Sequence, residues 1–238
     1  MKKTLFISTL ALSLGAFAHL SLANEHGANL ATPWTLPQWN ATQSAMPLGD
    51  ALKGEKLHRD AMCMTCHGAH GIAPSRNVPN LADNTPEYTF KMLLDYQSGL
   101  RHEGDGKSAV MQAAAHALSQ QDMADLAVYY AQQTLPKTDA AKPTEFAKVD
   151  RLVRKGDASR MITPCASCHG AHGEGNEVTP ALAGQTPHYF IRTMHAYKAG
   201  HRTNDIHEGM GQFTHDLTDA EITALADYYA ALDSGKGK

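Results

Sequence analysis

The chain has 238 residues, a formal net charge of −3 and only 7% aromatic side chains. This length allows one large domain or two small ones, and a small domain with few aromatics needs a cofactor or crosslink to complete its core. The acidic balance argues against nucleic acid and anionic membrane surfaces as partners.

Residues 1–23 have the features of a secretory signal peptide. Lys2 and Lys3 precede an apolar run that ends at Phe17, and small residues suited to signal peptidase follow. We expect cleavage after Ala23, because polar residues come directly after it. A retained membrane anchor is the alternative, although the apolar run is short for a span. Removing the two lysines leaves 19 basic against 24 acidic side chains, a charge of −5.

Residues 24–48 form an extension ahead of the first predicted domain. This segment contains both tryptophans of the chain, Trp34 and Trp39, and almost no charge. We expect a coil that packs back on the domain that follows. The alternative is a docking arm for a partner, since exposed tryptophan is typical of interface anchors.

The rest of the chain contains one domain twice. Residues 63–71, CMTCHGAHG, return at 165–173 as CASCHGAHG, and these segments hold all four cysteines. The offset between the copies is 102 residues here and 99 near the end, where LSQQDMADLAVYYA matches LTDAEITALADYYA. We therefore predict domain 1 at residues 49–133, a linker at 134–148 and domain 2 at 149–238.

Each copy has the same predicted order of helices. A short helix precedes the cysteines, and a Gly/Pro loop and two further helices follow them. Pro86 and Pro187 mark the first turn of the middle helix, where a missing N–H costs nothing. The last helix opens with a capping box in each copy, at Ser119–Asp122 and Thr218–Glu221. No alternating strand pattern is present, so the predicted fold class is all-α.

The cysteines allow three kinds of site: a redox disulfide, a zinc site or a covalent cofactor site. A zinc ribbon needs two CxxC pairs close in sequence, whereas these pairs lie in separate repeats. A thioredoxin-type exchanger needs a βαβ setting, which is missing from the pattern. It also gives no reason for the histidine that follows the second cysteine of each pair.

The CxxCH pattern is the attachment signal for c-type haem. Both thiols form thioethers with the vinyl groups, and the adjoining imidazole becomes the proximal ligand of the iron. We therefore predict two covalently bound haem c groups with the iron ligands His67 and His169. The predicted attachment residues are Cys63, Cys66, Cys165 and Cys168.

The repeat also selects a sixth ligand for each iron. Of the ten methionines, only Met111 and Met210 superimpose between the copies. Each lies seven residues before the leucine that precedes the last helix, in a segment that we expect to be a loop. A thioether ligand favours ferrous iron and raises the potential, which suits an electron carrier.

Histidine is the competing ligand type. His116 aligns with His215, and His70 aligns with His172. Because His70 and His172 follow the proximal histidine by three residues, they lie on its side of the ring. We expect all four at the surface or in hydrogen bonds, and an influence on the haem potential through protonation is the alternative.

Two such domains in tandem resemble the cytochrome c4 family over about residues 49–233. The shared features are the CxxCH, a Pro-Asn-Leu or Pro-Ala-Leu loop, the methionine segment and a last helix that ends in Tyr-Tyr-Ala. The resemblance implies two class I cytochrome c domains, each wrapped around one haem c, with His/Met ligation and pseudo-twofold symmetry. It also matches Gly54 and Gly156 to the contact between first and last helix, opposite Tyr129/Tyr130 and Tyr228/Tyr229.

The same resemblance implies a periplasmic carrier of single electrons. Its redox partners would be a quinol-oxidising complex or dehydrogenase on one side and a terminal oxidase or reductase on the other. The tryptophan extension and the many histidines depart from the family pattern. They leave the partners, the haem potentials, peripheral membrane association and the oligomeric state open.

Enzymes of related architecture are less compatible with the residues. Thiosulfate dehydrogenases use an additional cysteine as an iron ligand, and this chain has no cysteine outside its two CxxCH motifs. Di-haem peroxidases need one open iron, whereas both copies keep their methionine. We therefore expect no catalytic residues, and the alternative function is an electron-accepting subunit of such an enzyme.

Overall fold

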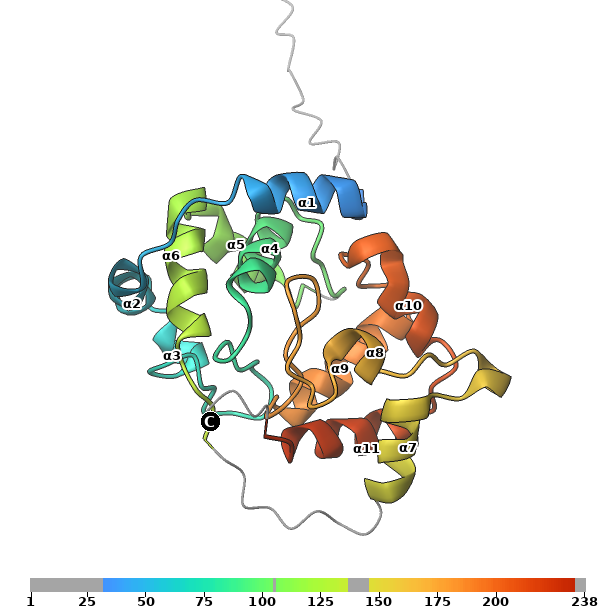
Figure 1. Ribbon diagram of the computed structural model, residues 1–238. Helices are drawn as coiled ribbons and strands as arrows, with labels where there is room; N and C mark the ends of the chain where they lie inside the picture. The colour runs from blue at the N-terminus through green and yellow to red at the C-terminus, as the bar shows by residue number, and fades with distance from the viewer. Residues whose placement is uncertain (1–31, 105, 137–145, 234–238) are drawn as a thin grey trace, which may run out of the picture.

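The computed structural model describes residues 32–104, 106–136 and 146–233, so the predicted signal peptide lies outside it (Figure 1). The regular elements of the described part are all helices, and its β structure is limited to one isolated bridge between Asp157 and Ile162. None of its helices combines the length and apolar character that a membrane span requires. The predicted all-α fold class is therefore confirmed.

The helices fall into an extension and two domains, which lie side by side in Figure 1. The extension holds α1 (Leu36–Ser44). Domain 1 contains α2 (Ala51–Asp60), α3 (Met64–His67), α4 (Pro86–Gln97), α5 (Ala109–His116) and α6 (Gln120–Ala131). Domain 2 contains α7 (Phe146–Lys155), η1 (Ala158–Arg160), α8 (Ala166–His169), α9 (Pro187–Lys198), η2 (Ile206–Glu208), α10 (Gly209–Thr214) and α11 (Asp219–Ala230).

The predicted helix starts are confirmed in both domains. Pro86 and Pro187 occupy the first turns of α4 and α9. Ser119 and Asp122 form a reciprocal capping box at α6, and Thr218 and Glu221 form the same box at α11. These caps satisfy N–H groups that no helical carbonyl reaches.

Helices α2 and α6 of domain 1 touch backbone to backbone. A Cβ atom at Gly54 would lie 2.1 Å from the carbonyl oxygen of Asp125 and 2.8 Å from Cβ of Tyr129. The expected contact of Gly54 with the last helix is therefore confirmed.

The corresponding expectation for Gly156 in domain 2 is wrong. The offset of 102 aligns α2 with residues 153–162, whereas α7 ends at Lys155. Gly156 has φ +65°, and a Cβ atom there would meet the carbonyl oxygen of Ile162 at 2.1 Å. It is a turn glycine, because Asp157 caps the short helix η1 directly after it. Helix α7 also begins within the segment that the sequence predicts as linker.

The extension packs on domain 1 as a helix, where the sequence predicts a coil. Thr35 forms a capping box with Gln38 at the start of α1. Trp39 is fully buried and packs in one cluster with Phe90 and Met123 of domain 1. A buried indole is unavailable to a partner, so Trp39 is part of the core.

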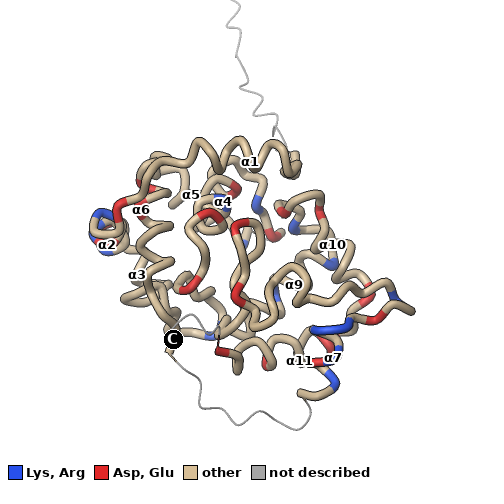
Figure 2. Tube along the Cα trace, viewed as in Figure 1, with Lys and Arg blue, Asp and Glu red and all other residues tan. Residues whose placement is uncertain are grey.

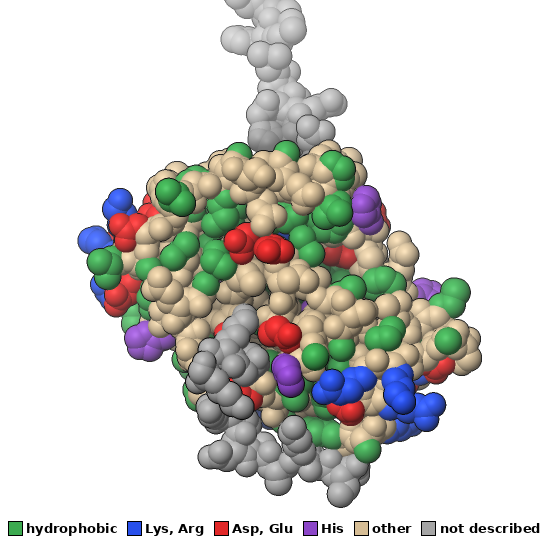
Figure 3. Space-filling model, viewed as in Figure 1, with side chains coloured by type: hydrophobic (Ala, Val, Ile, Leu, Met, Phe, Trp, Pro, Cys, Tyr) green, Lys and Arg blue, Asp and Glu red, His purple; other side chains and the backbone are tan. Residues whose placement is uncertain are grey.

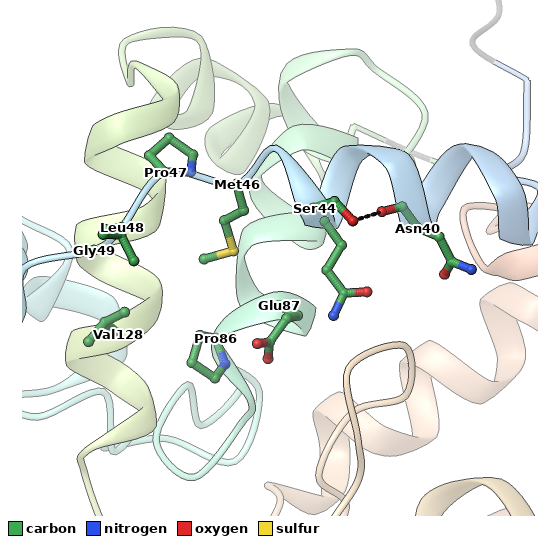
Figure 4. A pocket seen from close by; sticks show the side chains of 10 residues that line it. Asn40, Ser44, Met46, Pro47, Leu48, Gly49, Pro86, Glu87 and Val128 are labelled. Carbon is green, nitrogen blue, oxygen red and sulfur yellow. Dashed lines mark hydrogen bonds between the residues drawn. The ribbon is translucent and has the colours of Figure 1, made fainter.

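A groove of about 560 Å³ remains between the extension and domain 1 (Figure 4). Met46 extends toward Pro86 and Glu87 at the start of α4. The lining residues all come from α1, residues 46–49, α4 and α6, so the groove lies away from both CxxCH motifs.

The Gly54 contact makes a prediction about stability. We expect Gly54→Ala to lower the free energy of unfolding by about 3 kcal/mol, because the new Cβ overlaps backbone that must move. Gly211→Ala is the matched control, since its Cβ would meet no atom closer than 3.7 Å. Urea unfolding followed by circular dichroism compares the two variants. Equal stability of the two would contradict the close approach of α2 and α6.

Candidate functional site

The two CxxCH motifs fold alike. Each forms a single helical turn, α3 or α8, that begins directly after the first cysteine. A glycine with positive φ, Gly68 at +73° or Gly170 at +85°, ends each turn. All four thiols are free of disulfide bonds; Cys63 and Cys165 are half-buried, whereas Cys66 and Cys168 are exposed. Both motifs therefore present one inner and one outer thiol.

The thiols are unlike those of a disulfide exchanger. Burial raises the pKa of the Cys63 and Cys165 thiols. Exchange requires a thiolate, which those enzymes obtain by lowering the pKa of one cysteine. The environment of these thiols thus favours attachment chemistry over redox cycling.

The two predicted proximal histidines have the same fixed tautomer. His67 Nδ1 lies 3.1 Å from the carbonyl oxygen of Pro79, and His169 Nδ1 lies 3.1 Å from that of Pro180. A carbonyl only accepts, so each Nδ1 carries the proton and each Nε2 keeps a lone pair that can bind a metal. Burial lowers the pKa of both imidazoles, which keeps them in the neutral form that coordinates iron.

The predicted sixth ligands lie in short helices, which corrects the expectation of loops. Met111 is the third residue of α5, and Met210 is the second residue of α10. Alanine-rich sequence explains the helix in domain 1. Both methionines are half-buried, and Met210 packs against the apolar core of domain 2.

The competing histidines lie at the surface. His70 and His172 are exposed, as are His116 and His215. His116 Nδ1 lies 2.8 Å from the carbonyl oxygen of Gln112, and His215 Nδ1 lies 2.8 Å from Oδ1 of Asp216. These positions agree with the expected surface and hydrogen-bonding roles.

Another histidine, His58, lies within the site of domain 1, and no motif in the sequence indicates it. Its Nε2 donates to the carbonyl oxygen of Gly68 at 2.9 Å, and its Nδ1 accepts from the Tyr130 hydroxyl at 2.8 Å. Burial lowers its pKa. The neutral ring thereby ties the turn after His67 to α2 and α6. Arg160 occupies the aligned position of domain 2, so the repeat does not mark His58 as a residue shared by both sites.

Two buried arginines meet at the interface between the domains. Arg101 lies over the Tyr96 ring and Arg202 over the Tyr197 ring, each at 4.5 Å from the ring centroid. Arg101 donates across the interface to the hydroxyl of Tyr189 at 2.8 Å. The repeat offset of 101 aligns these two arginines, and this alignment is the feature of the sequence that could have indicated them.

The buried positive charge suits a ligand that carries carboxylates. Arg101 pairs with Glu103 at 2.9 Å, whereas Arg202 donates to the side-chain oxygen of Asn204 at 2.8 Å. Nε of Arg101 is buried without a hydrogen-bond partner, and its charge helps to lower the pKa of His67. A haem carries two propionate carboxylates, so the residues present fit such a group.

Helices α2 and α7 each carry several exposed basic side chains. Figure 2 shows lysine and arginine on α2 and α7, and Figure 3 shows the basic patch over α7. Lys148, Arg151 and Lys155 are exposed on α7, which packs on α8.

Comparison with known proteins agrees with this geometry. The Cytochrome c family model matches residues 51–134 and 154–233, once in each domain. The chain is 34% identical over 195 residues to cytochrome c4 of Thiocapsa roseopersicina, which covers 80% of this chain and 97% of the relative. It is 34% identical over 172 residues to the thiosulfate dehydrogenase electron acceptor of Stutzerimonas stutzeri (strain A1501), which covers 71% and 77%.

A solved structure shares the arrangement of both domains. Reduced recombinant cytochrome c4 from Pseudomonas stutzeri has a TM-score of 0.70 and 32% sequence identity, and the match covers 77% of this chain and 99% of that one. The chain therefore belongs to the cytochrome c4 family, as an electron-transfer cytochrome that carries two covalently bound haem c groups.

Proposed function

We propose that the chain is an exported, periplasmic carrier that passes single electrons between two redox proteins. Its donor would be a quinol-oxidising complex or a dehydrogenase, and its acceptor a terminal oxidase or reductase. The matched hydrogen bonds from His67 to Pro79 and from His169 to Pro180 support this proposal most. They prepare the same ligand atom in both domains, as a carrier with two equivalent centres requires.

Each domain offers a complete set of groups for its haem. The two thiols of the motif would form the thioethers, and His67 or His169 would bind the iron through Nε2. Met111 or Met210 would supply the second protein ligand of that iron. The haem supplies a one-electron couple when bound. Arg101 and Arg202 would compensate the carboxylate charge inside the protein, where an isolated charge is costly.

This ligand set favours a carrier over an enzyme. A catalytic haem needs a coordination position for its substrate, and methionine would fill that position in both domains. The proline carbonyls hold the imidazoles in place, so electron transfer requires little rearrangement of the ligands.

A second candidate is an electron-accepting subunit of a thiosulfate dehydrogenase. The relative from Stutzerimonas stutzeri (strain A1501) bears that name. The structure of thiosulfate dehydrogenase (TsdBA) from Marichromatium purpuratum has a TM-score of 0.65 and 28% identity, and the match covers 79% of this chain and 41% of that one. In both candidates the chain itself only transfers electrons.

The methionine assignment makes a spectroscopic prediction. We expect Met111→Ala and Met210→Ala each to remove about half of the far-red band that Met-to-iron charge transfer produces in the oxidised protein. Each variant should also lower the potential of one haem and bind one carbon monoxide per chain when reduced. Met161→Ala is the control, because Met161 is 83% exposed. A full band in either ligand variant would contradict the assignment.

The attachment residues make a prediction about haem content. We expect the double variant Cys63→Ser and Cys66→Ser to retain one haem per chain, because domain 2 keeps its own motif. The variant Cys165→Ser and Cys168→Ser should likewise retain one. Intact-protein mass spectrometry counts the covalent groups directly. Two haems in either variant would mean that the thioethers form elsewhere.

The choice between donors can be tested with the oxidised holoprotein. We expect quinol-supplied membranes to reduce both haems, and thiosulfate alone to reduce neither. Addition of thiosulfate with a catalytic thiosulfate dehydrogenase subunit tests the second candidate. Reduction in that mixture but not by the membranes would favour the acceptor-subunit function. Reduction by thiosulfate alone would contradict both candidates.

A further inference from the structure

The segment that carries Met210 has weaker local structure than its counterpart in domain 1. Helix α10 has six residues, GMGQFT, and two of them are glycine. Helix α5 has eight residues, AVMQAAAH, and four of them are alanine. Glycine destabilises a helix by about 1 kcal/mol relative to alanine. The Met210 segment therefore depends more on contacts from outside.

The turn before α10 is also locally unfavourable. His207 and Glu208 both have left-handed backbone conformations, with φ of 54° and 55°. Residues with side chains avoid this region, and the matching loop of domain 1 places Gly104 and Gly106 there instead. Such a conformation persists only where the surroundings hold it.

The surroundings that hold this turn come from the extension. The His207 N–H donates to the carbonyl oxygen of Trp34 at 3.1 Å. Ile206 packs against the apolar cluster that contains Trp34 and Trp39. The Asp205 carboxylate then accepts from the Met210 N–H at 2.6 Å. A short chain of contacts thus joins Trp34 to the backbone of Met210.

Trp34 is itself fixed by buried charged groups. Its Nε1 donates to Oδ1 of Asp95 at 2.5 Å, and Lys91 Nζ lies 5.6 Å from its ring centroid. Asp95 also pairs with Lys91 at 2.7 Å and accepts from Asn204 Nδ2 at 2.6 Å. The loop before α10 is therefore held at two points. Asn204 bonds to Asp95 of α4, and His207 bonds to Trp34 of the extension.

We propose that Trp34 is a positioning residue for Met210, so that methionine coordination at the haem of domain 2 depends on the extension. This inference rests on the proposed ligation by Met210. Helix α5, which carries Met111, packs on α4, and α10 packs on α9 of its own domain, but the turn before α10 also receives a backbone hydrogen bond from the extension. Loss of the Trp34 contact therefore affects one haem of the two.

Trp34→Ala in the holoprotein tests the inference, with Trp39→Phe as the control. Trp39 lies on the same extension and its ring packs edge-on against the Trp34 ring, with 5.7 Å between the centroids. Its Nε1 has no hydrogen-bond partner, so Trp39→Phe keeps an aromatic ring in the cluster and leaves the Trp34–Asp95 hydrogen bond in place. We expect Trp34→Ala to lose about half of the far-red charge-transfer band and to bind one carbon monoxide per chain when reduced. Trp39→Phe should keep the full band and bind none.

A rescue variant separates positioning from general damage. Gly211→Ala adds a helix-favouring residue to α10 without a close contact. We expect Gly211→Ala to restore the band in the Trp34→Ala background. A stable Trp34→Ala protein with a full band would overturn the inference. So would a band that stays halved after rescue while both haems remain bound.

Met210→Ala, measured beside these variants, distinguishes the two ways of failing. If Met210→Ala keeps the full band, the proposed ligation is wrong and the inference falls with it. If Met210→Ala halves the band and Trp34→Ala does not, only the positioning role is wrong. If Trp34→Ala does not fold, Trp34→Phe replaces it as the test, because it keeps an aromatic ring and removes the hydrogen bond to Asp95. We then expect carbon monoxide to bind one haem at least tenfold faster than in the wild type, and an unchanged rate would overturn the inference.

Discussion

The hydrogen bond from each proximal imidazole to a proline carbonyl is the constraint on which both sites depend. His67 and His169 each donate from Nδ1, and this leaves Nε2 unprotonated in a buried setting. The proline loop, the CxxCH turn and the last helix must meet correctly for that bond to form. Gly54 permits the close helix contact in domain 1, and His58 ties the turn to the last helix there.

The interface between the domains is polar and charged, yet it is buried. Lys91 and Asp95 form an ion pair that is almost inaccessible to solvent, and Asn204 of domain 2 contacts both residues. A buried ion pair adds little net stability, because desolvation opposes the attraction. The buried ammonium and carboxylate groups still need hydrogen-bond partners, and Asn204 supplies them in one relative position of the domains. The pair therefore specifies how the two domains are oriented, which matters for electron transfer between them.

The two copies differ in the contacts that their corresponding residues make. Domain 1 uses His58 where domain 2 has Arg160, which pairs with Glu221 on the surface. Domain 2 has the methionine segment with two glycines, and the turn before it is hydrogen-bonded to Trp34 of the N-terminal extension. Duplication thus supplied two similar haem sites, while contacts outside the repeat made their surroundings unequal. Unequal surroundings are one means of separating the behaviour of chemically identical centres.

The sequence by itself determined the fold class, the duplication and the haem motifs, because helix caps and CxxCH are local patterns. Ser119, for example, marks the start of α6 through the capping box with Asp122, which depends only on residues close in sequence. The helical conformation of α1 and the position of Gly156 in a turn became clear only from the folded structure. The tertiary structure also decided that Arg101 and Trp34 face the other domain. These features arise from contacts between residues far apart in the chain, and such contacts leave no periodic pattern in the sequence.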